Sequence, residues 1–475
     1  MNLTPHPAQD APPAQPAVSQ PRFVTGSLMR HVTVMAGTGA VGLVAVFAVD
    51  LINLFYITLL GEKATAAAVG FAGVVQFFHT SICIGITIGI AALVARTVGA
   101  GRLTDARRLA TSSLLVMVGA AVLVSSTTFF FLGPVLQLLG ARGEVAVLAE
   151  RYLSVTVHAL PLLGIGMACA ALLRSVGDAR RAMTVTLAAA FVSAVLDPIL
   201  IFGLDLGLDG AAIGAVISRA VMAGMGLYGV LVKHRMLSRP NWPALPADAR
   251  LLWGVAGPAV LTNLATPVGM AFVTKSIAQF GPSAIAGAAT IDRVTPVAFG
   301  LIYALSGAVG PILAQNLGAG QLGRVREGLR ASLTFMVVAV GIAWLLLALL
   351  QGVLIRSFSA EGAAADLITL FCSVLAGSFF FVGSLFVANA AFNNLGFPLL
   401  STAFNWGRAT LGTIPFAWVG AHYGPGGVLA GQALGSSIFG LLAIVVAFRV
   451  TARLEREHVR READAALGAQ EQPLA

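Results

Sequence analysis

The chain has 475 residues, of which 57% are hydrophobic and only 10% are charged, and its formal net charge at pH 7 is +9. Because soluble domains carry charge on roughly a quarter of their residues, this composition excludes an ordinary soluble fold and predicts a polytopic helical membrane protein. The basic residues lie mainly in loops, as membrane-orientation signals do, so we expect a lipid bilayer and no nucleic acid as the partner.

Twelve apolar segments follow a Pro-, Ala- and Gln-rich tail, predicted to be disordered and cytoplasmic over residues 1–26. Each segment is long enough to cross a bilayer. The first six form a predicted N-terminal lobe (27–236), with spans at 30–60, 65–97, 108–138, 147–173, 182–203 and 210–232. After a proline-rich linker (237–250), the second six form a C-terminal lobe (251–455), with spans at 251–279, 284–317, 328–355, 364–392, 399–421 and 426–450. Residues 456–475 are expected to be a second cytoplasmic tail.

A short segment occurs twice along the chain, 219 residues apart. Residues 95–107 and 314–326 are identical at six of thirteen positions, including the triplets Gly99–Gly101 and Gly318–Gly320. Each copy ends an apolar span and begins a basic loop. Because each half has six spans, both halves start on the same side of the membrane. The repeat therefore predicts two six-helix lobes related by a parallel pseudo-two-fold axis along the membrane normal.

The distribution of Lys and Arg predicts the orientation. Of the 29 such residues, the loops after odd-numbered spans hold only Lys63, Arg142, Arg151 and Arg356. This bias places both termini in the cytoplasm of a cell-membrane protein. The three cysteines lie far apart inside apolar segments, so we expect no metal site, disulfide framework or cofactor.

Asp50 is the clearest candidate for an ion-coupling residue. It is the only charged residue between Ala36 and Leu60, and Asn53 lies one turn further on the same face. An acid in mid-span costs roughly 2.5–3.5 kcal/mol, so it is expected to be functional. We expect Asp50 to face a polar cavity and to switch between neutral and charged forms near neutral pH, as proton coupling requires. A structural hydrogen bond is the alternative.

Asp197 is the second candidate. It lies in an apolar run with Ser193 one turn before it and Pro198 directly after it. Pro198 frees the carbonyl of Ala194 from helix hydrogen bonding, so oxygen ligands for a sodium ion would also be available. A helix-end cap is the structural alternative. Asn53, Ser193 and His158 are further candidates to line a cavity in the first half.

The second half lacks acids at the equivalent positions. Asp292 lies inside a span beside Arg293, and we interpret the two as a charge-paired structural site or the edge of a span. Lys275 has no neighbouring acid and is expected to extend to the outer membrane surface.

Four stretches of the sequence carry a resemblance to a known family. They are Ala91–Gly101 at the end of span 2, Leu172–Met183 between spans 4 and 5, Val195–Ala212 around the span 5–6 hairpin, and Pro311–Gly320 at the end of span 8. In order and spacing they resemble the multidrug and toxic compound extrusion (MATE) family of the MOP flippase superfamily, in the branch named for the DNA-damage-inducible transporter.

The resemblance implies a V-shaped pair of lobes that exports organic, often cationic, compounds in exchange for protons or sodium. In that branch an Asp in helix 1 and an Asp in helix 5 carry the coupling cation, and Asp50 and Asp197 stand at these positions. Ser193 replaces an Asn that is common in the family, and Ala215 replaces a Thr expected in helix 6. Thr266 stands where other branches have an acid in helix 7.

We therefore expect a monomeric, proton-coupled antiporter that exports organic, cationic or amphiphilic small molecules by alternating access. Sodium is the alternative coupling ion. A lipid-linked saccharide flippase or a dedicated metabolite exporter of the same superfamily is the alternative function, and the flippase would require several arginines in its cavity for pyrophosphate. A membrane enzyme is not expected, since the sequence contains no catalytic constellation.

Overall fold

The computed structural model describes residues 21–59 and 63–470, and over these residues it is helical, without a β-strand. The first half is built of α1 (Leu28–Leu59), α2 (Lys63–Gly99), α3 (Leu103–Phe130), α4 (Leu132–Leu138), α5 (Gly143–Thr156), η1 (Val157–Ala159), α6 (Leu160–Ser175), α7 (Ala179–Pro198), η2 (Ile199–Gly203), α8 (Gly207–Leu227) and η3 (Tyr228–Lys233).

The second half is built of α9 (Leu245–Ala278), α10 (Pro282–Ala298), α11 (Gly300–Gly318), α12 (Leu322–Ser357), α13 (Ala363–Ser373), η4 (Leu375–Ser378), α14 (Phe379–Leu395), α15 (Pro398–Gly407), η5 (Arg408–Gly412), α16 (Ile414–Gly420), η6 (Ala421–Tyr423) and α17 (Pro425–Gln470). Eleven helical segments within the described ranges are long and apolar enough to cross a membrane. The eleventh predicted span is the exception, because α15, η5 and α16 are separate short pieces.

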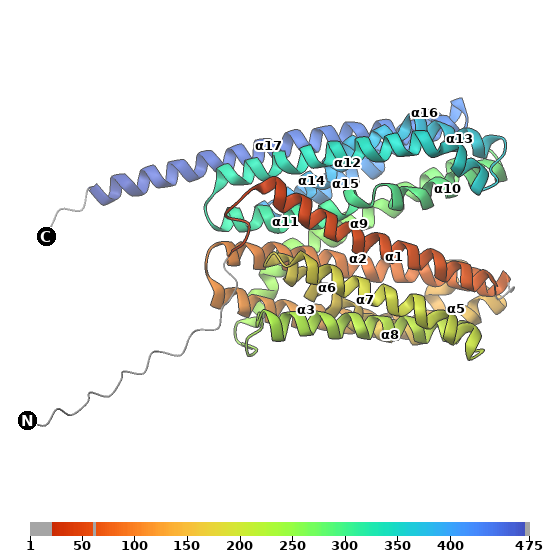
Figure 1. Cartoon of the computed structure of the whole chain (residues 1–475), viewed down its shortest axis with the longest axis horizontal. Coiled ribbons are helices and arrows are strands. Elements are labelled where there is room, and N and C mark those ends of the chain that lie inside the picture. The colour runs from red at the N-terminus through yellow and green to blue at the C-terminus, as the bar shows by residue number, and fades with distance from the viewer. Residues whose placement is uncertain (1–20, 60–62, 471–475) are drawn as a thin grey trace, which may run out of the picture.

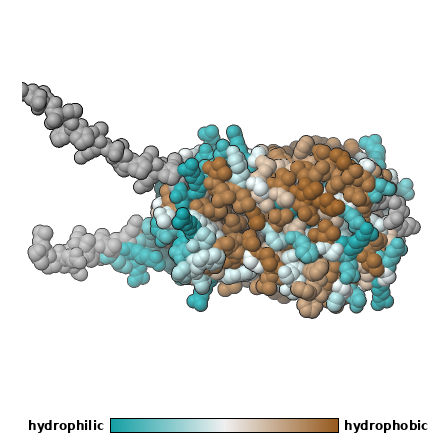
Figure 2. All heavy atoms as spheres, turned by 90° about the horizontal axis from the view of Figure 1, so that it is seen from below, coloured by the Kyte–Doolittle hydropathy of each residue, from teal (hydrophilic) through white to brown (hydrophobic). Residues whose placement is uncertain are grey.

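The two halves form two bundles, as expected from the repeat. Figure 1 shows most helices of the first half in the lower layer and those labelled α10 to α17 in the upper layer, while α1 runs from the upper layer to the lower one; the start of α1 and the end of α17 lie at the same end of the molecule. Each bundle has its own core, around Met117 and Leu172 in the first half and around Phe299 and Phe392 in the second. Figure 2 shows a broad hydrophobic band between hydrophilic ends, as a bilayer requires.

The bundles converge at the end where α1 begins. A Cβ atom on Gly99 of α2 would lie 2.0 Å from the carbonyl oxygen of Gln315, and one on Gly318 of α11 would lie 1.9 Å from that of Arg96. The two copies of the repeated Gly-Ala-Gly segment therefore pack directly against each other. Further along, α2 approaches α9 closely at Gly85 and Val260. These contacts form the apex of the expected V-shaped architecture.

Helix α1 passes from one bundle to the other. In the first half of α1, Gly39 lies against Ala304 and Val44 against Gly300 of α11, while Gly42 between them lies against Thr186 of α7 in the first bundle. Further along, Tyr56 makes an edge-on ring contact with Phe202 of the first bundle. The second half of α1, which carries Asp50, therefore contacts the first bundle.

Three predicted boundaries differ from the structure. The third span was predicted to reach residue 138, but α3 ends at Phe130 and α4 is a separate short helix. Helix α9 begins at Leu245, within the predicted linker, because Pro246 fits the first turn of a helix. Helix α17 continues to Gln470, into the predicted C-terminal tail.

The prediction of a disordered tail over residues 1–26 is wrong for its last residues. Phe23 is 2% exposed, its amide donates to Gln315 Oε1 (2.9 Å), and its carbonyl accepts from Asn316 and Arg324. Arg22 Nη1 donates to the carbonyl of Gly177 in the other lobe (3.1 Å). This segment thus bridges the two lobes at their apex. Residues 1–20 lie outside the described residues.

Candidate functional site

Asp197 lies near the end of α7 in a hydrogen-bonded chain that reaches α1. Asn53 Nδ2 donates to Ser193 Oγ (3.2 Å), and Ser193 Oγ donates to Asp197 Oδ2 (2.6 Å). The Asp197 side chain is 2% exposed and Ser193 is also buried. The helix widens into the π turn η2 directly after Pro198, in keeping with the lost backbone donor. Three of the predicted site residues are thus brought together.

This hydrogen-bonded series of side chains leaves two buried acceptor oxygens without a donor. Within the described residues, neither Asp197 Oδ1 nor Asn53 Oδ1 has a hydrogen-bond partner. Both oxygens belong to side chains that hydrogen-bond to the same Ser193 hydroxyl. Buried acceptors normally find a donor, so two orphaned oxygens at one place indicate a site that takes up a proton or a small cation.

Gly214 of α8 makes room for the Asp197 carboxylate. A Cβ atom at position 214 would lie 2.0 Å from Asp197 Oδ1. Ala215 follows it and is half-buried, but its methyl group offers no hydrogen bond. The hydroxyl expected from the family pattern at position 215 is absent here, and the neighbouring Oδ1 remains without a partner.

Asp50 lies one turn before Asn53 on α1, and its side chain is exposed. Over residues 21–59 and 63–470, its carboxylate makes no hydrogen bond or ion pair. The phenol of Tyr152 on α5 lies close enough to Asp50 and Asp197 for both charges to act on it. The two acids therefore belong to one polar region of the first lobe, one buried and one accessible.

Sequence reasoning missed Arg219 of α8, which lies within electrostatic range of Tyr152. Its Nη1 donates to the carbonyl of Thr156 (2.8 Å) and its Nη2 to Gln76 Oε1 (3.5 Å). It forms no ion pair with any carboxylate in the described part of the chain. The sequence does indicate this residue, because Arg219 is the one charged residue in the apolar span between positions 210 and 232. An unpaired arginine inside a span is expected to be functional.

The second lobe contains a similar isolated arginine. Arg408 begins η5 in the middle of the broken eleventh span, and its Nη2 donates to Thr266 Oγ1 on α9 (3.4 Å). Its Nε is buried without a partner in the described residues. Tyr303 of α11 lies within electrostatic range of both Arg408 and Asp292.

Four other predicted residues lie apart from this region. The His158 side chain is exposed, its ring contacts Phe129 of α3 (4.7 Å between centroids), and its Nδ1 pairs with the carbonyl of Ser154. Asp292 and Arg293 are both exposed and do not pair with each other, because consecutive residues on a helix point in different directions. The charge-paired interpretation of this site is therefore wrong. Lys275 is exposed in the last turn of α9.

The described residues contain no cluster of three or more His, Cys, Asp or Glu side chains that could hold a metal ion. Oxygen atoms for a monovalent cation are nevertheless present, on Asp197, Asn53 and Ser193. The arrangement can exchange a proton or a small cation. It lies in the first lobe, the half of the sequence that contains the two mid-span acids.

Comparison with known proteins identifies the family. The family model described as MatE matches residues 40–199 and 258–419, once in each lobe. The chain belongs to the MatE family. It is therefore a multi-pass membrane transporter and not an enzyme.

Among its relatives is a protein named FAD transporter from Shewanella oneidensis, 29% identical over 417 residues, covering 86% of this chain and 92% of the relative. Multidrug export protein MepA from Staphylococcus aureus is 23% identical over 415 residues, covering 85% and 90%. The crystal structure of a mutant of the Vibrio cholerae MATE transporter VcmN superimposes with a TM-score of 0.85 at 24% identity, covering 90% of this chain and 97% of that one.

Proposed function

We propose that this MatE transporter is a secondary active antiporter that exports organic, cationic or amphiphilic small molecules in exchange for protons. The observation that carries the proposal is the pair of orphaned buried acceptors, Asp197 Oδ1 and Asn53 Oδ1. A proton on Asp197 Oδ1 would give this pair the donor that it lacks, and would remove a buried charge from the first lobe.

Asp50 complements Asp197 because it is exposed and without a partner among the described residues. A proton arriving from water reaches Asp50 first and Asp197 afterwards, through the polar region that contains Tyr152. Neutralisation of the two acids lowers the attraction of the first lobe for a cationic cargo. It also changes the hydrogen bond that holds α1 to α7 through Asn53, so that α1 rearranges and the lobes alternate.

The test is pH-gradient-driven and Na⁺-gradient-driven efflux of several dyes from proteoliposomes. We expect the wild type to use the pH gradient and both Asp197→Asn and Asp50→Asn to lose coupled export by at least tenfold. Ser437→Ala, which removes a hydroxyl bonded only to its own helix in α17, serves as the matched control. Proton-coupled export by Asp50→Asn at the wild-type rate overturns the mechanism, and export driven only by Na⁺ assigns the site to sodium.

A second candidate cargo is an organic anion that carries phosphate. Arg219 and Arg408 lie inside the membrane without carboxylate partners in the described residues, and guanidinium groups bind phosphate well. A relative is named FAD transporter. Two measurements distinguish the two cargoes. Export of FAD by the wild type that is lost in Arg408→Gln favours the anion. Export of a cationic dye that added FAD does not inhibit favours the cation.

We further propose that the protein acts as a monomer in the cell membrane with both termini in the cytoplasm. The bias of Lys and Arg toward one set of loops supports this orientation. Labelling of single cysteines introduced at Arg330 and at Arg356 with an impermeant reagent tests it. We expect only the residue 356 variant to react in intact cells, and the reverse pattern would contradict the orientation.

A further inference from the structure

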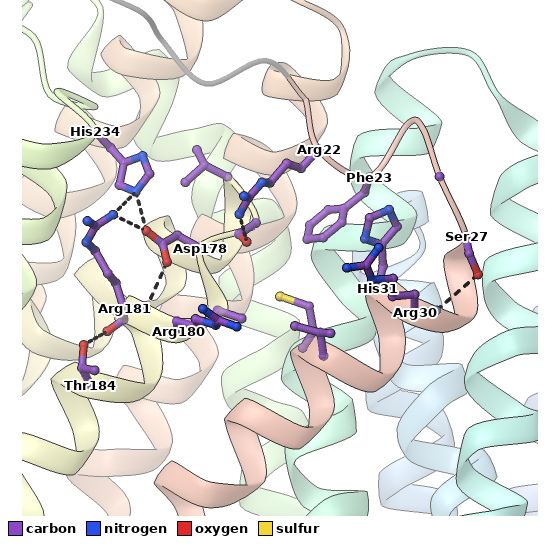
Figure 3. Close-up of a pocket in the computed structure, with 16 residues that line it drawn as sticks. Arg22, Phe23, Ser27, Arg30, His31, Asp178, Arg180, Arg181, Thr184 and His234 are labelled. Carbon is purple, nitrogen blue, oxygen red and sulfur yellow. Dashed lines mark hydrogen bonds and ion pairs between the residues drawn. The ribbon is translucent and has the colours of Figure 1, made fainter.

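A cavity of about 890 Å³ lies between the first turns of α1 and α7 (Figure 3). Its walls are formed by residues 22–35, by the loop before α7 with the first turns of that helix, and by His234. Asp197 lies 19 residues further along α7 than Asp178, which corresponds to roughly 28 Å of helix. The cavity is therefore distinct from the ion-coupling region.

The lining is strongly basic. Four arginines and two histidines surround it, against a single acid: Arg22, Arg30, Arg180, Arg181, His31, His234 and Asp178. The acid is already paired, because Asp178 Oδ2 accepts from Arg181 Nη1 (2.6 Å) and from His234 Nε2 (2.8 Å). Burial alone would raise the pKa of Asp178, but the hydrogen bonds from His234 and Arg181 outweigh it and hold that pKa well below its usual range. Asp178 thus stays ionised without neutralising the rest of the cavity.

Two of the arginines are available to a ligand. The guanidinium groups of Arg30 on α1 and Arg180 on α7 are exposed and make no hydrogen bond or ion pair within the described ranges. They lie on facing walls of the cavity (Figure 3). Both helices also begin at this cavity. The start of α7 is capped by the Asp178 carboxylate, which accepts from the Arg181 amide, whereas the positive end of the α1 dipole adds to the attraction for an anion.

Each of these arginines is followed, on the same face of its helix, by exposed apolar side chains. On α1, Arg30 is followed on the same face by Val34 and Val41, which are 46% and 53% exposed. On α7, Arg180 is followed on the same face by Phe191, which is 70% exposed. A basic headgroup site that continues into a hydrophobic surface at membrane depth matches a phospholipid better than a soluble anion.

We propose that this cavity binds the phosphate headgroup of an anionic membrane phospholipid, with Arg30 and Arg180 holding the phosphate and the acyl chains lying along α1 and α7. The bound lipid joins the starts of two helices that also meet the bridging segment at Phe23. The site depends neither on the coupling ion nor on the cargo.

The test uses the full-length protein in neutral detergent, with thermal unfolding followed during titration with phosphatidylglycerol, phosphatidylcholine or glycerol 3-phosphate. We expect saturable stabilisation by phosphatidylglycerol alone. In Arg30→Gln/Arg180→Gln the midpoint of the titration should rise about thirtyfold, which corresponds to ~1 kcal/mol for each basic residue. The matched control is Arg330→Gln/Arg449→Gln, which removes two exposed arginines without partners in the described residues and outside the cavity.

Three results overturn the proposal. Equal stabilisation by phosphatidylcholine shows that charge is not recognised, and equal stabilisation by glycerol 3-phosphate assigns the cavity to a soluble phosphate compound. An unchanged titration midpoint in the double variant shows that the two arginines do not hold the headgroup. If the double variant does not fold, Arg30→Lys/Arg180→Lys retains the charge but not the bidentate geometry. A severalfold weaker titration in this variant supports the site, and an unchanged one contradicts it.

Discussion

Replacement of Gly214 by alanine tests the proposed ion-coupling role of Asp197 and its neighbours without changing a charged residue. The new Cβ atom would lie 2.0 Å from Asp197 Oδ1, whereas ordinary contacts of a Cβ atom begin near 3.4 Å. The carboxylate must therefore retreat by about 1.4 Å. A displacement of this size stretches or breaks its 2.6 Å hydrogen bond from Ser193 Oγ.

The expected free energies follow from these contacts. Loss of a hydrogen bond to a charged group costs about 1.5–3 kcal/mol, and alanine in place of glycine in a helix returns about 1 kcal/mol. We expect a net destabilisation of about 0.5–2 kcal/mol for Gly214→Ala. Gly224→Ala on the same helix is the matched control, because a Cβ atom there meets nothing within 4 Å, and it should stabilise the protein by up to about 1 kcal/mol.

Thermal unfolding and pH-gradient-driven efflux from proteoliposomes measure the two effects. Gly214→Ala should unfold at a lower temperature than the wild type and lose coupled efflux by at least tenfold. Gly224→Ala should unfold at the same or a higher temperature and transport normally. If both variants behave alike in both assays, the position of Asp197 against α8 does not matter for coupling and the reasoning is refuted.

Three further predictions concern the apex of the V. Gly99→Ala should destabilise the protein by about 1–3 kcal/mol in thermal unfolding, because its Cβ would lie 2.0 Å from the Gln315 carbonyl oxygen, while Gly119→Ala, with nothing within 4 Å, should not; equal midpoints would contradict the close crossing. Phe23→Ala should cost about 3–5 kcal/mol because the ring is 2% exposed, and a midpoint equal to that of the wild type would show that the bridging segment is not docked. Asp178→Asn should lower the free energy of unfolding by about 1–2 kcal/mol at pH 7. Because folding lowers the pKa of Asp178, its carboxylate stabilises the protein fully above the pKa of the unfolded state, and this stabilisation is lost as the pH falls. The difference in unfolding free energy between wild type and variant should therefore narrow below about pH 4, and a constant difference from pH 7 to pH 3 would argue against the ion pairs.

Contacts between residues that are close together along the chain could be predicted from the sequence. Ser193 and Asp197 are four residues apart on one helix, so their contact follows from helical geometry. The spans follow from hydrophobic length. The span predicted at 284–317 is divided into α10 and α11 three residues after Pro296, a break that the prediction did not include. The end of α3 was missed although Gly133 and Pro134 mark the start of a new helix there.

Contacts between distant helices could not be predicted in this way. The hydrogen bond from Asn53 to Ser193 joins residues 140 positions apart, and those of Arg219 join α8 to α2 and α5. Burial of Phe23 depends on a single aromatic residue in a polar segment, which no periodic pattern reveals. These interactions depend on how the helices pack, and the spacing of residues along the sequence does not reveal that packing.

The crossing of Gly99 and Gly318 has a consequence for the origin of the molecule. Each glycine fits against the backbone of the other copy, which is the reciprocal geometry of an isologous dimer. A six-helix ancestor could have paired with itself through this same surface before its gene was duplicated and fused. In such a homodimer every mutation occurs on both sides at once, whereas in a fused chain the two lobes can differ, as they do here in Asp50 and Asp197.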